Sequence, residues 1–410
     1  MNDLEQNRFD AFVREHLGDD TARLLLSRGR WPDVDVALAA DTIEGMRRMR
    51  HKVPEWDVPG LVYPDRLCTE QASSSATARF KASLIRGMGA ARVADLTGGL
   101  GVDSWAFSDV AEKVFYNEMN VVLRDAVEHN FGVLGVRNVL FHSVELLFHG
   151  VKDLLGDFAP DVIFLDPARR GEGGRKVFLI EDCRPDVVTL LPELLEVSPR
   201  VVVKLSPMAD ISMVVSRLDG VRDVYAVASG GECKELLVLI ERGFAGVVKL
   251  HAVELGEKTE ILSFGMEEKG EVVLADGVEE GMLLFEPGKA LMKTGAFGVI
   301  CSRFGLGKIG IHTHLYVAPG SFGANHGMML DMGKWFRVVE VLKSGKEAMR
   351  KIRERWPRAE VTARNVPMTS DQLRAKLKVA SGGDVHVFCC RADYAGGGSD
   401  VIFIVAEPLR

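Results

Sequence analysis

The chain has 410 residues, of which 47% are hydrophobic and 27% are charged, and its formal net charge is −7. This composition is typical of a soluble globular protein, and the length predicts about two to four domains. No apolar run is long enough to span a bilayer, the chain starts with polar and acidic residues, and the six cysteines lack a Cys-x-x-Cys spacing, so we expect a cytoplasmic protein without membrane contacts, disulfides or a bound metal.

The first 85 residues are expected to form a helical domain. Apolar residues recur there at helical spacing, and the alternation typical of strands is missing. Helices are predicted over residues 8–17, 21–28 and 34–48, with Asp20 and Asp33 available as N-terminal caps.

Residues 86–243 follow a repeated strand–helix rhythm that predicts an α/β domain. Strands are expected at 91–97, 113–118, 138–143, 161–166, 200–206, 222–228 and 234–241. The last two are joined by Ser229-Gly230-Gly231-Glu232, which is too short for a helical crossover. We therefore expect a seven-stranded sheet that ends in an antiparallel pair.

The turn after the first of these strands is rich in glycine and reads Asp95-Leu96-Thr97-Gly98-Gly99-Leu100-Gly101. Glycine lacks a Cβ, so a nucleotide-like ligand can approach the backbone closely. Glu118 ends the next strand and is placed to accept hydrogen bonds from ribose hydroxyls. NAD sites share these features, but the glycine spacing is not the Gly-x-Gly-x-x-Gly of a pyrophosphate cradle. The pattern favours S-adenosylmethionine (SAM), which carries no phosphate.

The fourth strand runs into Asp166-Pro167-Ala168-Arg169-Arg170, at the carboxyl edge where open α/β sheets bind their ligands. Asp166 is the best candidate for a catalytic residue, although a strand-end aspartate can also simply cap the following turn. Arg169 and Arg170 suit phosphate contacts with a polyanionic substrate, or they are solvated loop residues. Lys204, on the fifth strand, is expected to pair with Asp166 or with the substrate.

The C-terminal part divides by pattern into a β-rich α+β linker domain at 244–330 and a β-α-β-α-β-β domain at 331–410. In the linker domain, β segments are expected at 246–253, 261–264, 271–274 and 309–317, around a helix at 287–293. The segment 331–379 contains thirteen lysines and arginines and six acidic residues. Its net charge is therefore +7, which leaves −14 for the rest of the chain. Such a basic module suits a local contact with a polyanion such as RNA, while a solvated helix face is the alternative.

Two further motifs are discounted. Gly305-Leu306-Gly307-Lys308-Ile309-Gly310 matches a dinucleotide fingerprint, but it precedes a predicted strand and not a helix. His312, His314 and His326 form a weak metal trio, because carboxylate or cysteine neighbours at ligand spacing are missing.

Four motifs taken together resemble the class I SAM-dependent methyltransferases: the glycine-rich turn, Asn117-Glu118, Leu165-Asp166-Pro167-Ala168-Arg169-Arg170 and Val203-Lys204-Leu205-Ser206-Pro207. The whole chain resembles a bacterial group in which this domain precedes a THUMP-like domain and which is regarded as RNA methyltransferases. The resemblance implies a seven-stranded Rossmann-like methyltransferase domain at 86–243, an N-terminal helical domain at 1–85, and C-terminal α+β domains at 244–330 and 331–410. The last of these would be THUMP-like and bind RNA.

For the cofactor, the resemblance implies contacts from the following residues: Asp95, Thr97, Gly98, Gly99, Gly101, Asp103, Glu118, Met119, Ser143 and Asp166. Asp166 and the carbonyl of Pro167 would act in catalysis, and Arg169, Arg170 and Lys204 would contact the substrate. Gln71 and Ser73 would belong to a lid over the cofactor, or to an ordinary helix cap. Ser143 stands near the point where related enzymes carry an acidic residue for adenine.

The chain also departs from two related patterns. Ala168 and Arg169 replace the proline and aromatic residue with which amino-group methyltransferases stack a base. The segment 203–207 lacks the cysteine nucleophile of 5-methyluridine RNA methyltransferases, which disfavours C5 alkylation. The expected function is methylation of a nitrogen or oxygen of structured RNA, either rRNA or tRNA. The alternatives are a non-catalytic SAM- or RNA-binding protein, and a protein or small-molecule methyltransferase.

Overall fold

The computed structural model of the protein describes residues 3–146, 150–169, 183–268, 270–318 and 332–409, except for the side chains of Asp3 and Arg169. These residues divide into two compact units. The first comprises Met1–Arg222 and Leu236–Ala245, and the second comprises Asp223–Glu235 and Gly246–Arg410. None of the described helices is both long and apolar enough to cross a lipid bilayer.

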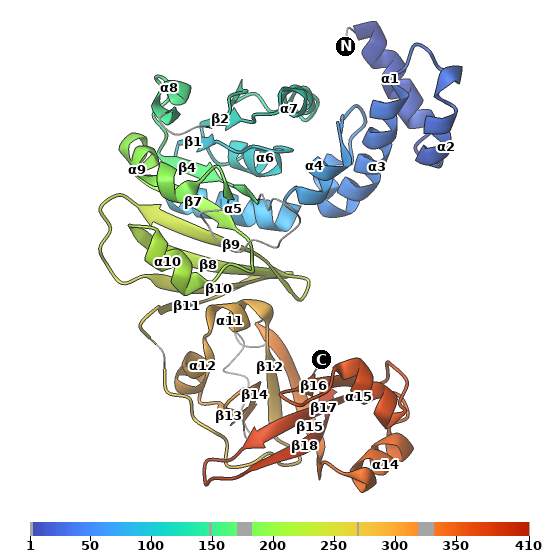
Figure 1. Ribbon diagram of the computed structural model, residues 1–410, viewed down its shortest axis with the longest axis vertical. Coiled ribbons are helices and arrows are strands. Elements are labelled where there is room, and N and C mark those ends of the chain that lie inside the picture. Colours follow the sequence, from blue (N-terminus) through green and yellow to red (C-terminus); the bar gives the residue numbers. More distant parts are fainter. Residues whose placement is uncertain (1–2, 147–149, 170–182, 269, 319–331, 410) are drawn as a thin grey trace. The chain divides into compact units, whose positions relative to one another are not determined.

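The first unit begins with the expected helices, drawn in blue in Figure 1. They are α1 (Asp3–Glu15), α2 (Thr21–Leu26), α3 (Val36–Lys52) and α4 (Arg66–Gln71), with the 3₁₀ turns η1 (Arg28–Arg30) and η2 (Pro54–Trp56). Asp20 caps α2 as predicted. The prediction for α3 is wrong: Asp35, and not Asp33, accepts the first free N–H groups of the helix, those of Ala37 and Leu38.

A parallel sheet with one reversed strand forms the centre of the first unit. Its order is β9-β7-β4-β1-β2-β3, with β1 at Arg92–Asp95, β2 at Lys113–Asn117, β3 at Val139–His142, β4 at Val162–Leu165, β7 at Arg200–Leu205 and β9 at Glu232–Glu241. Strand β9 runs antiparallel to β7 and the other neighbouring pairs in this order are parallel, so the last predicted strand of the domain is reversed relative to the others. All four residues of β4 are buried, as expected for a strand covered on both faces.

Helices connect these strands, and one of them, α7 (Val121–Val133), contacts the N-terminal part of the chain. They are α5 (Ser75–Gly87), α6 (Val102–Ser108), α7, α8 (Val151–Leu155), α9 (Val187–Val197) and α10 (Ile211–Arg217), while the short strands β5 (Ala168–Arg169) and β6 (Cys183–Arg184) pair with each other. The buried side chain of Asn130 on α7 exchanges two 2.8 Å hydrogen bonds with the backbone of Val62. The segment after the N-terminal helices is thereby fixed to α7.

The second unit begins with β8 (Val221–Ser229), which turns through Gly230 and Gly231, both at positive φ, into the start of β9. Strand β10 (Lys249–Leu255) pairs parallel to β8 and antiparallel to β11 (Thr259–Gly265). The boundary predicted after residue 243 therefore separates β10 from its parallel partner β8.

A seven-stranded sheet with the order β13-β14-β12-β15-β18-β17-β16 forms the rest of the second unit. Its elements are β12 (Leu283–Pro287), α11 (Lys289–Thr294), α12 (Phe297–Phe304), β13 (Gly307–Gly310), β14 (Thr313–Ala318), β15 (Gly333–Lys343), α14 (Lys346–Arg355), β16 (Glu360–Arg364), α15 (Ser370–Leu377), β17 (His386–Asp393) and β18 (Ser399–Pro408). From residue 333 onward the order is the predicted β-α-β-α-β-β.

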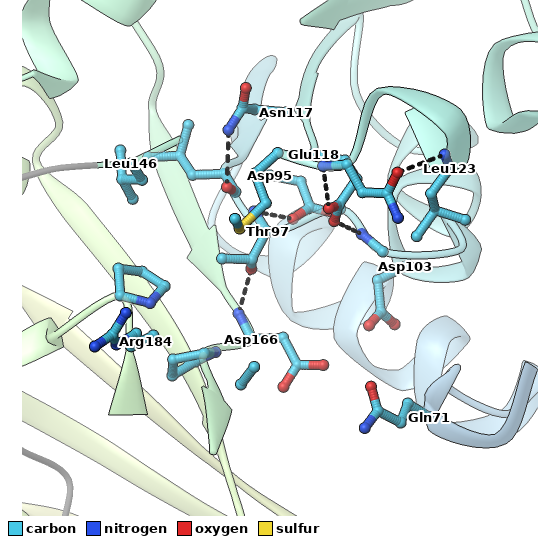
Figure 2. A pocket seen from close by; sticks show the side chains of 18 of the residues that line it. Gln71, Asp95, Thr97, Asp103, Asn117, Glu118, Leu123, Leu146, Asp166 and Arg184 are labelled. Atoms are coloured by element: carbon cyan, nitrogen blue, oxygen red, sulfur yellow. Dashed lines mark hydrogen bonds between the residues drawn. The ribbon is translucent and has the colours of Figure 1, made fainter. Parts of the chain in front are cut away.

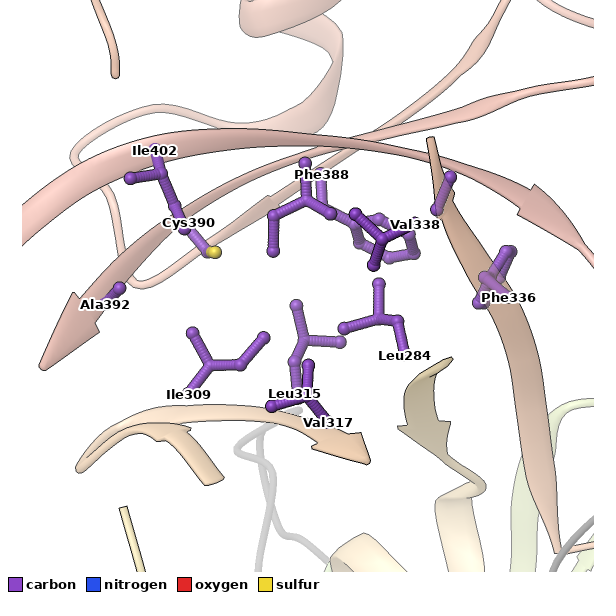
Figure 3. Packing of buried hydrophobic residues seen from close by; sticks show 12 residues of the cluster. Leu284, Ile309, Leu315, Val317, Phe336, Val338, Phe388, Cys390, Ala392 and Ile402 are labelled. Carbon is purple, nitrogen blue, oxygen red and sulfur yellow. The ribbon is translucent and has the colours of Figure 1, made fainter. Parts of the chain in front are cut away.

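Side chains from both predicted C-terminal domains share one apolar cluster, seen in Figure 3. Leu284, Ile309 and Leu315 come from the segment expected as a linker, and they pack with Phe336 and Phe388 of the THUMP-like segment. On the other face, α14 and α15 cover a second cluster (Figure 1). Ala348 and Ile352 point into it from α14, four residues apart.

Local predictions for the segment 271–317 hold only in part. Residues 271–274, expected as a strand, form a single bridge between Leu274 and Lys308. The strand expected over 309–317 is two antiparallel strands, β13 and β14, which pair at Gly310 and Thr313. Helix α12 was not predicted, because its apolar residues at helical spacing fall in a segment read as β-rich.

Candidate cofactor site and reaction centre

A cavity of about 1500 Å³ lies where β1, β2 and β4 end, as the switch-point rule for open α/β sheets predicts (Figure 2). Nine of the ten residues expected to bind cofactor line it: Asp95, Thr97, Gly98, Gly99, Gly101, Asp103, Glu118, Met119 and Asp166. Pro167 and Lys204 line it as well. The tertiary structure thus brings most of the predicted site residues to one cavity.

Glycine is needed in the loop after β1 for two different reasons. A Cβ on Gly98 would lie 2.0 Å from the ring of Tyr116, and a Cβ on Gly101 would lie 2.7 Å from Val127. These two positions therefore admit the close packing of the loop on its own domain. Only Gly99, whose nearest atom would be 4.0 Å away, leaves open space for a ligand. The Tyr116 hydroxyl donates a 2.6 Å hydrogen bond to the Gly99 carbonyl and holds this position in place.

Glu118 is held at the same loop by two backbone amides. Its carboxylate accepts the N–H of Gly99 at 3.1 Å and the N–H of Asn120 at 2.9 Å. A carboxylate has about four acceptor positions, so room remains for ligand hydroxyls. Ser143 does not line the cavity, and its hydroxyl instead donates to the Glu118 carbonyl at 2.9 Å.

Asp95 is a buried residue that stabilises the glycine-rich loop through hydrogen bonds. Only 1% of its surface is exposed, and its carboxylate accepts the Ser104 hydroxyl at 2.6 Å and the Thr97 N–H at 3.2 Å. Burial raises the pKa of Asp95 to about 7, and the negative charges of Asp103 and Asp166 act in the same direction. Asp95 is therefore a structural anchor of the loop at least as much as a ligand contact.

The candidate reaction centre combines the ends of β4 and β7. The side chain of Lys204 forms a close ion pair with the carboxylate of Asp166. The two side chains are 15% and 36% exposed, so the pair faces the cavity without being fully open to solvent. The N–H of Asp166 donates a 2.6 Å hydrogen bond to the Thr97 hydroxyl. Of the two partners that the sequence left open for Lys204, the structure selects Asp166.

The remaining predicted substrate contacts lie next to this pair. Arg169 is in β5, where its backbone pairs with Cys183, and Arg170 lies outside the described residues. The sequence interpretation missed Arg184, which is exposed, lines the same cavity and is labelled in Figure 2. Its neighbour Asp186 accepts the N–H of Thr189 and begins α9. This N-terminal cap at Asp186 is the sequence signal that could have placed Arg184 close to the start of a helix.

Sequence reasoning also missed Lys81. This side chain is 1% exposed on α5, and its ammonium lies 2.9 Å from the carboxylate of Asp103 and 2.8 Å from the Ser73 hydroxyl. Ser73 and Gln71, the two lid candidates, both line the cavity. A lysine within an amphipathic helix ordinarily faces solvent, so the sequence contains no signal for this burial.

The discounted motifs take no part in the cavity. Gly307–Gly310 is strand β13 and precedes β14, so no helix begins there. His326 lies outside the described residues, and no group of three potential metal ligands occurs among the residues that are described. Burial and the nearby charge of Lys308 lower the pKa of His314 to about 4.

Comparison with known proteins identifies the two C-terminal segments. A ferredoxin-like domain model matches residues 283–321, and a THUMP domain-like model matches residues 333–408. Two Mycobacterium tuberculosis relatives, from strains CDC 1551 / Oshkosh and ATCC 25618 / H37Rv, are described as uncharacterized S-adenosylmethionine-dependent methyltransferases. Each is 25% identical over 345 residues, which is 83% of this chain and 87% of the relative.

The crystal structure of a proposed methyltransferase from Porphyromonas gingivalis W83 is similar over the whole length. It shares 30% sequence identity and a TM-score of 0.87, with 100% of both chains covered. The similarity thus includes the helical N-terminus, the sheet with the cavity and the C-terminal sheet. This chain belongs to the family of S-adenosylmethionine-dependent methyltransferases that carry a C-terminal THUMP-like domain.

Proposed function

We propose that this methyltransferase modifies a nitrogen or oxygen of structured RNA, either rRNA or tRNA. The observation that carries the proposal is a THUMP-like domain with exposed, uncompensated cations on the same chain as the methyltransferase site. The cations supply affinity for phosphates, and the site supplies methyl transfer.

The residues of the cavity fit SAM. Gly99 leaves its backbone open, and Glu118 keeps acceptor positions for the two ribose hydroxyls. Gly98 and Gly101 hold the loop against Tyr116 and Val127, so that these groups are in place before the cofactor arrives. Bound SAM supplies an electrophilic methyl group on a sulfonium.

Asp166 and Lys204 would prepare the nucleophile. The Asp166 carboxylate and the Pro167 carbonyl are acceptors for a substrate N–H or O–H, and they would orient that group toward the methyl donor by proximity. The ammonium of Lys204, paired with Asp166, would stabilise negative charge that develops as the nucleophile loses its proton. Because Ala168 offers no aromatic ring, base stacking at this position is not part of the proposal.

The candidate RNA surface lies on α14 and α15. Lys346, Arg350, Lys376 and Lys378 are exposed, and none of them pairs with an acidic side chain among the described residues. Lys351 and Arg355 are also exposed but are engaged by Glu340. The four unpaired cations are therefore the stronger candidates for phosphate contacts.

The deciding experiment incubates the purified chain with methyl-labelled SAM and total RNA from a strain that lacks the protein. Label in RNA that is lost with Asp166→Ala supports the proposal. Label in protein or in small molecules instead overturns the RNA substrate. Cofactor binding without any transfer would identify a non-catalytic binding protein.

A further inference from the structure

Three side chains form a buried charged network beside the glycine-rich loop. The Lys81 ammonium contacts the Ser73 hydroxyl at 2.8 Å and the Asp103 carboxylate at 2.9 Å, and the same hydroxyl donates to the other Asp103 oxygen at 2.8 Å. Lys81 is on α5, Ser73 precedes that helix, and Asp103 is on α6. The network therefore ties two helices together at the cavity wall.

The network presents a single charged group to the cavity. Ser73 and Asp103 line the cavity, whereas Lys81 does not. The Lys81 ammonium also lies 5.8 Å from the ring of Phe164. An apolar residue would pack there without the cost of burying a cation, so packing alone does not explain the lysine. Its contacts instead hold the Asp103 carboxylate in one orientation.

Three other carboxylates that line the cavity are buried or already have partners. Asp95 is buried under the loop, Glu118 is fixed by the amides of Gly99 and Asn120, and Asp166 is paired with Lys204. Lys81 and Ser73 hold the Asp103 carboxylate in place. Its Oδ1, next to the Lys81 ammonium, is buried, so acceptor capacity toward the cavity is left to Oδ2, which also accepts the Ser73 hydroxyl. In Figure 2, Asp103 lies between Glu118 and Gln71.

We propose that Asp103 binds the ammonium group at the amino-acid end of SAM, and that Lys81 and Ser73 are positioning residues for its carboxylate. With the ribose on Glu118, an extended cofactor would run along the glycine-rich loop from Glu118 to Asp103. The ammonium is the primary amine of the cofactor, and a fixed carboxylate is its strongest partner. This assignment concerns the cofactor alone and is independent of the RNA substrate.

The test compares two ligands on the full-length protein by isothermal titration calorimetry. S-adenosylhomocysteine has the amino-acid end, and 5′-methylthioadenosine has the same adenosine and thioether without it. Asp103→Asn is expected to weaken S-adenosylhomocysteine about tenfold or more, as for a lost charge-assisted hydrogen bond, and to leave 5′-methylthioadenosine within about twofold. Lys81→Met and Ser73→Ala should shift the affinity ratio in the same direction by less.

Two outcomes would overturn the assignment. If Asp103→Asn weakens the binding of both ligands equally, the network has a structural role only. If it changes neither affinity, the amino-acid end of the cofactor binds elsewhere. Lys81→Met leaves a charge unpaired and can fail to fold, so the double variant Lys81→Met/Asp103→Asn removes both charges and should bind both ligands with similar affinity. Ser83→Ala on the same helix is the matched control, because its exposed hydroxyl contacts only the Phe80 carbonyl.

Discussion

The Thr97 hydroxyl accepts the backbone N–H of Asp166 at 2.6 Å, so one hydrogen bond joins the cofactor loop after β1 to the reaction centre after β4. Thr97 is itself held by Asp95 through its own N–H. A series of polar contacts through Asp95, Thr97, Asp166 and Lys204 therefore connects the glycine-rich loop to the proposed nucleophile site. A substitution at any of these residues should affect both the loop and that site.

Thr97→Val tests this link. The substitution keeps the shape of the side chain and removes the acceptor of the Asp166 N–H, which should cost about 1 kcal/mol of unfolding free energy. Displacement of the Asp166 turn should lower single-turnover methyl transfer about tenfold at saturating SAM. Urea unfolding and rapid-quench kinetics measure the two effects. Unchanged transfer would show that the link does not orient Asp166.

Lys204→Met should reduce methyl transfer on the order of 10²- to 10³-fold, because the cation that stabilises developing charge is removed. The affinity for S-adenosylhomocysteine should change little, since the ion-pair partner of Lys204 is Asp166. Lys234→Met, at an exposed lysine paired with Glu232 on β9, is the matched control and should keep full activity. Loss of cofactor affinity in Lys204→Met would contradict the assigned role.

The buried carboxyl of Asp95 should make stability depend on pH. Its pKa is raised to about 7, above the value of about 4 in an unfolded chain, so the folded state binds an extra proton between these values. The stability contribution is present below about pH 4 and is lost as the pH rises through 7, by at most about 1.4 kcal/mol per pH unit. Asp95→Asn lacks this dependence. Its unfolding free energy relative to wild type should rise from pH 5 to 7 and level off above 8, and a constant difference would be contrary evidence.

Gly98→Ala should destabilise the fold by about 1–3 kcal/mol, because the added methyl group would meet the ring of Tyr116. Gly132→Ala is the control: nothing lies within 4 Å of its added Cβ on α7, and the change should stabilise by about 0.5–1 kcal/mol. Chemical denaturation distinguishes the two. If both variants behave alike, the close approach of Gly98 to Tyr116 is not a constraint on this loop.

Lys346→Glu/Arg350→Glu should weaken RNA binding and lower the salt dependence of affinity by about one unit of slope per lost phosphate contact. The affinity for S-adenosylhomocysteine should stay the same, because these residues belong to the THUMP-like domain and not to the cavity. Lys113→Glu/Lys152→Glu, at exposed lysines of β2 and α8, is the charge-matched control. Filter binding at several salt concentrations measures the effect, and equal loss in both variants would point to nonspecific electrostatics.

Local patterns in the sequence determined the strands of the methyltransferase domain, the helices α14 and α15, and the position of Asp166 and Glu118 at one sheet edge. The physical reason is that periodicity and turn residues act over a few neighbours, and that the carboxyl ends of parallel strands share an edge. The reversed strand β9 followed in the same way from the short Gly230-Gly231 connection. These features needed no information on distant contacts.

Only the tertiary structure decided which distant groups meet. Lys81 reads as a solvated lysine, and its contact with Asp103 depends on how α5 packs beside α6. The pairing of β12 with β15, which joins two predicted domains in one sheet, depends on register between segments about fifty residues apart, which local periodicity does not encode. The glycine at 98 was predicted as an opening for a ligand, but the ring that requires it comes from a different strand. Burial and charge pairing are properties of the assembled chain, so they appear only when its elements are packed together.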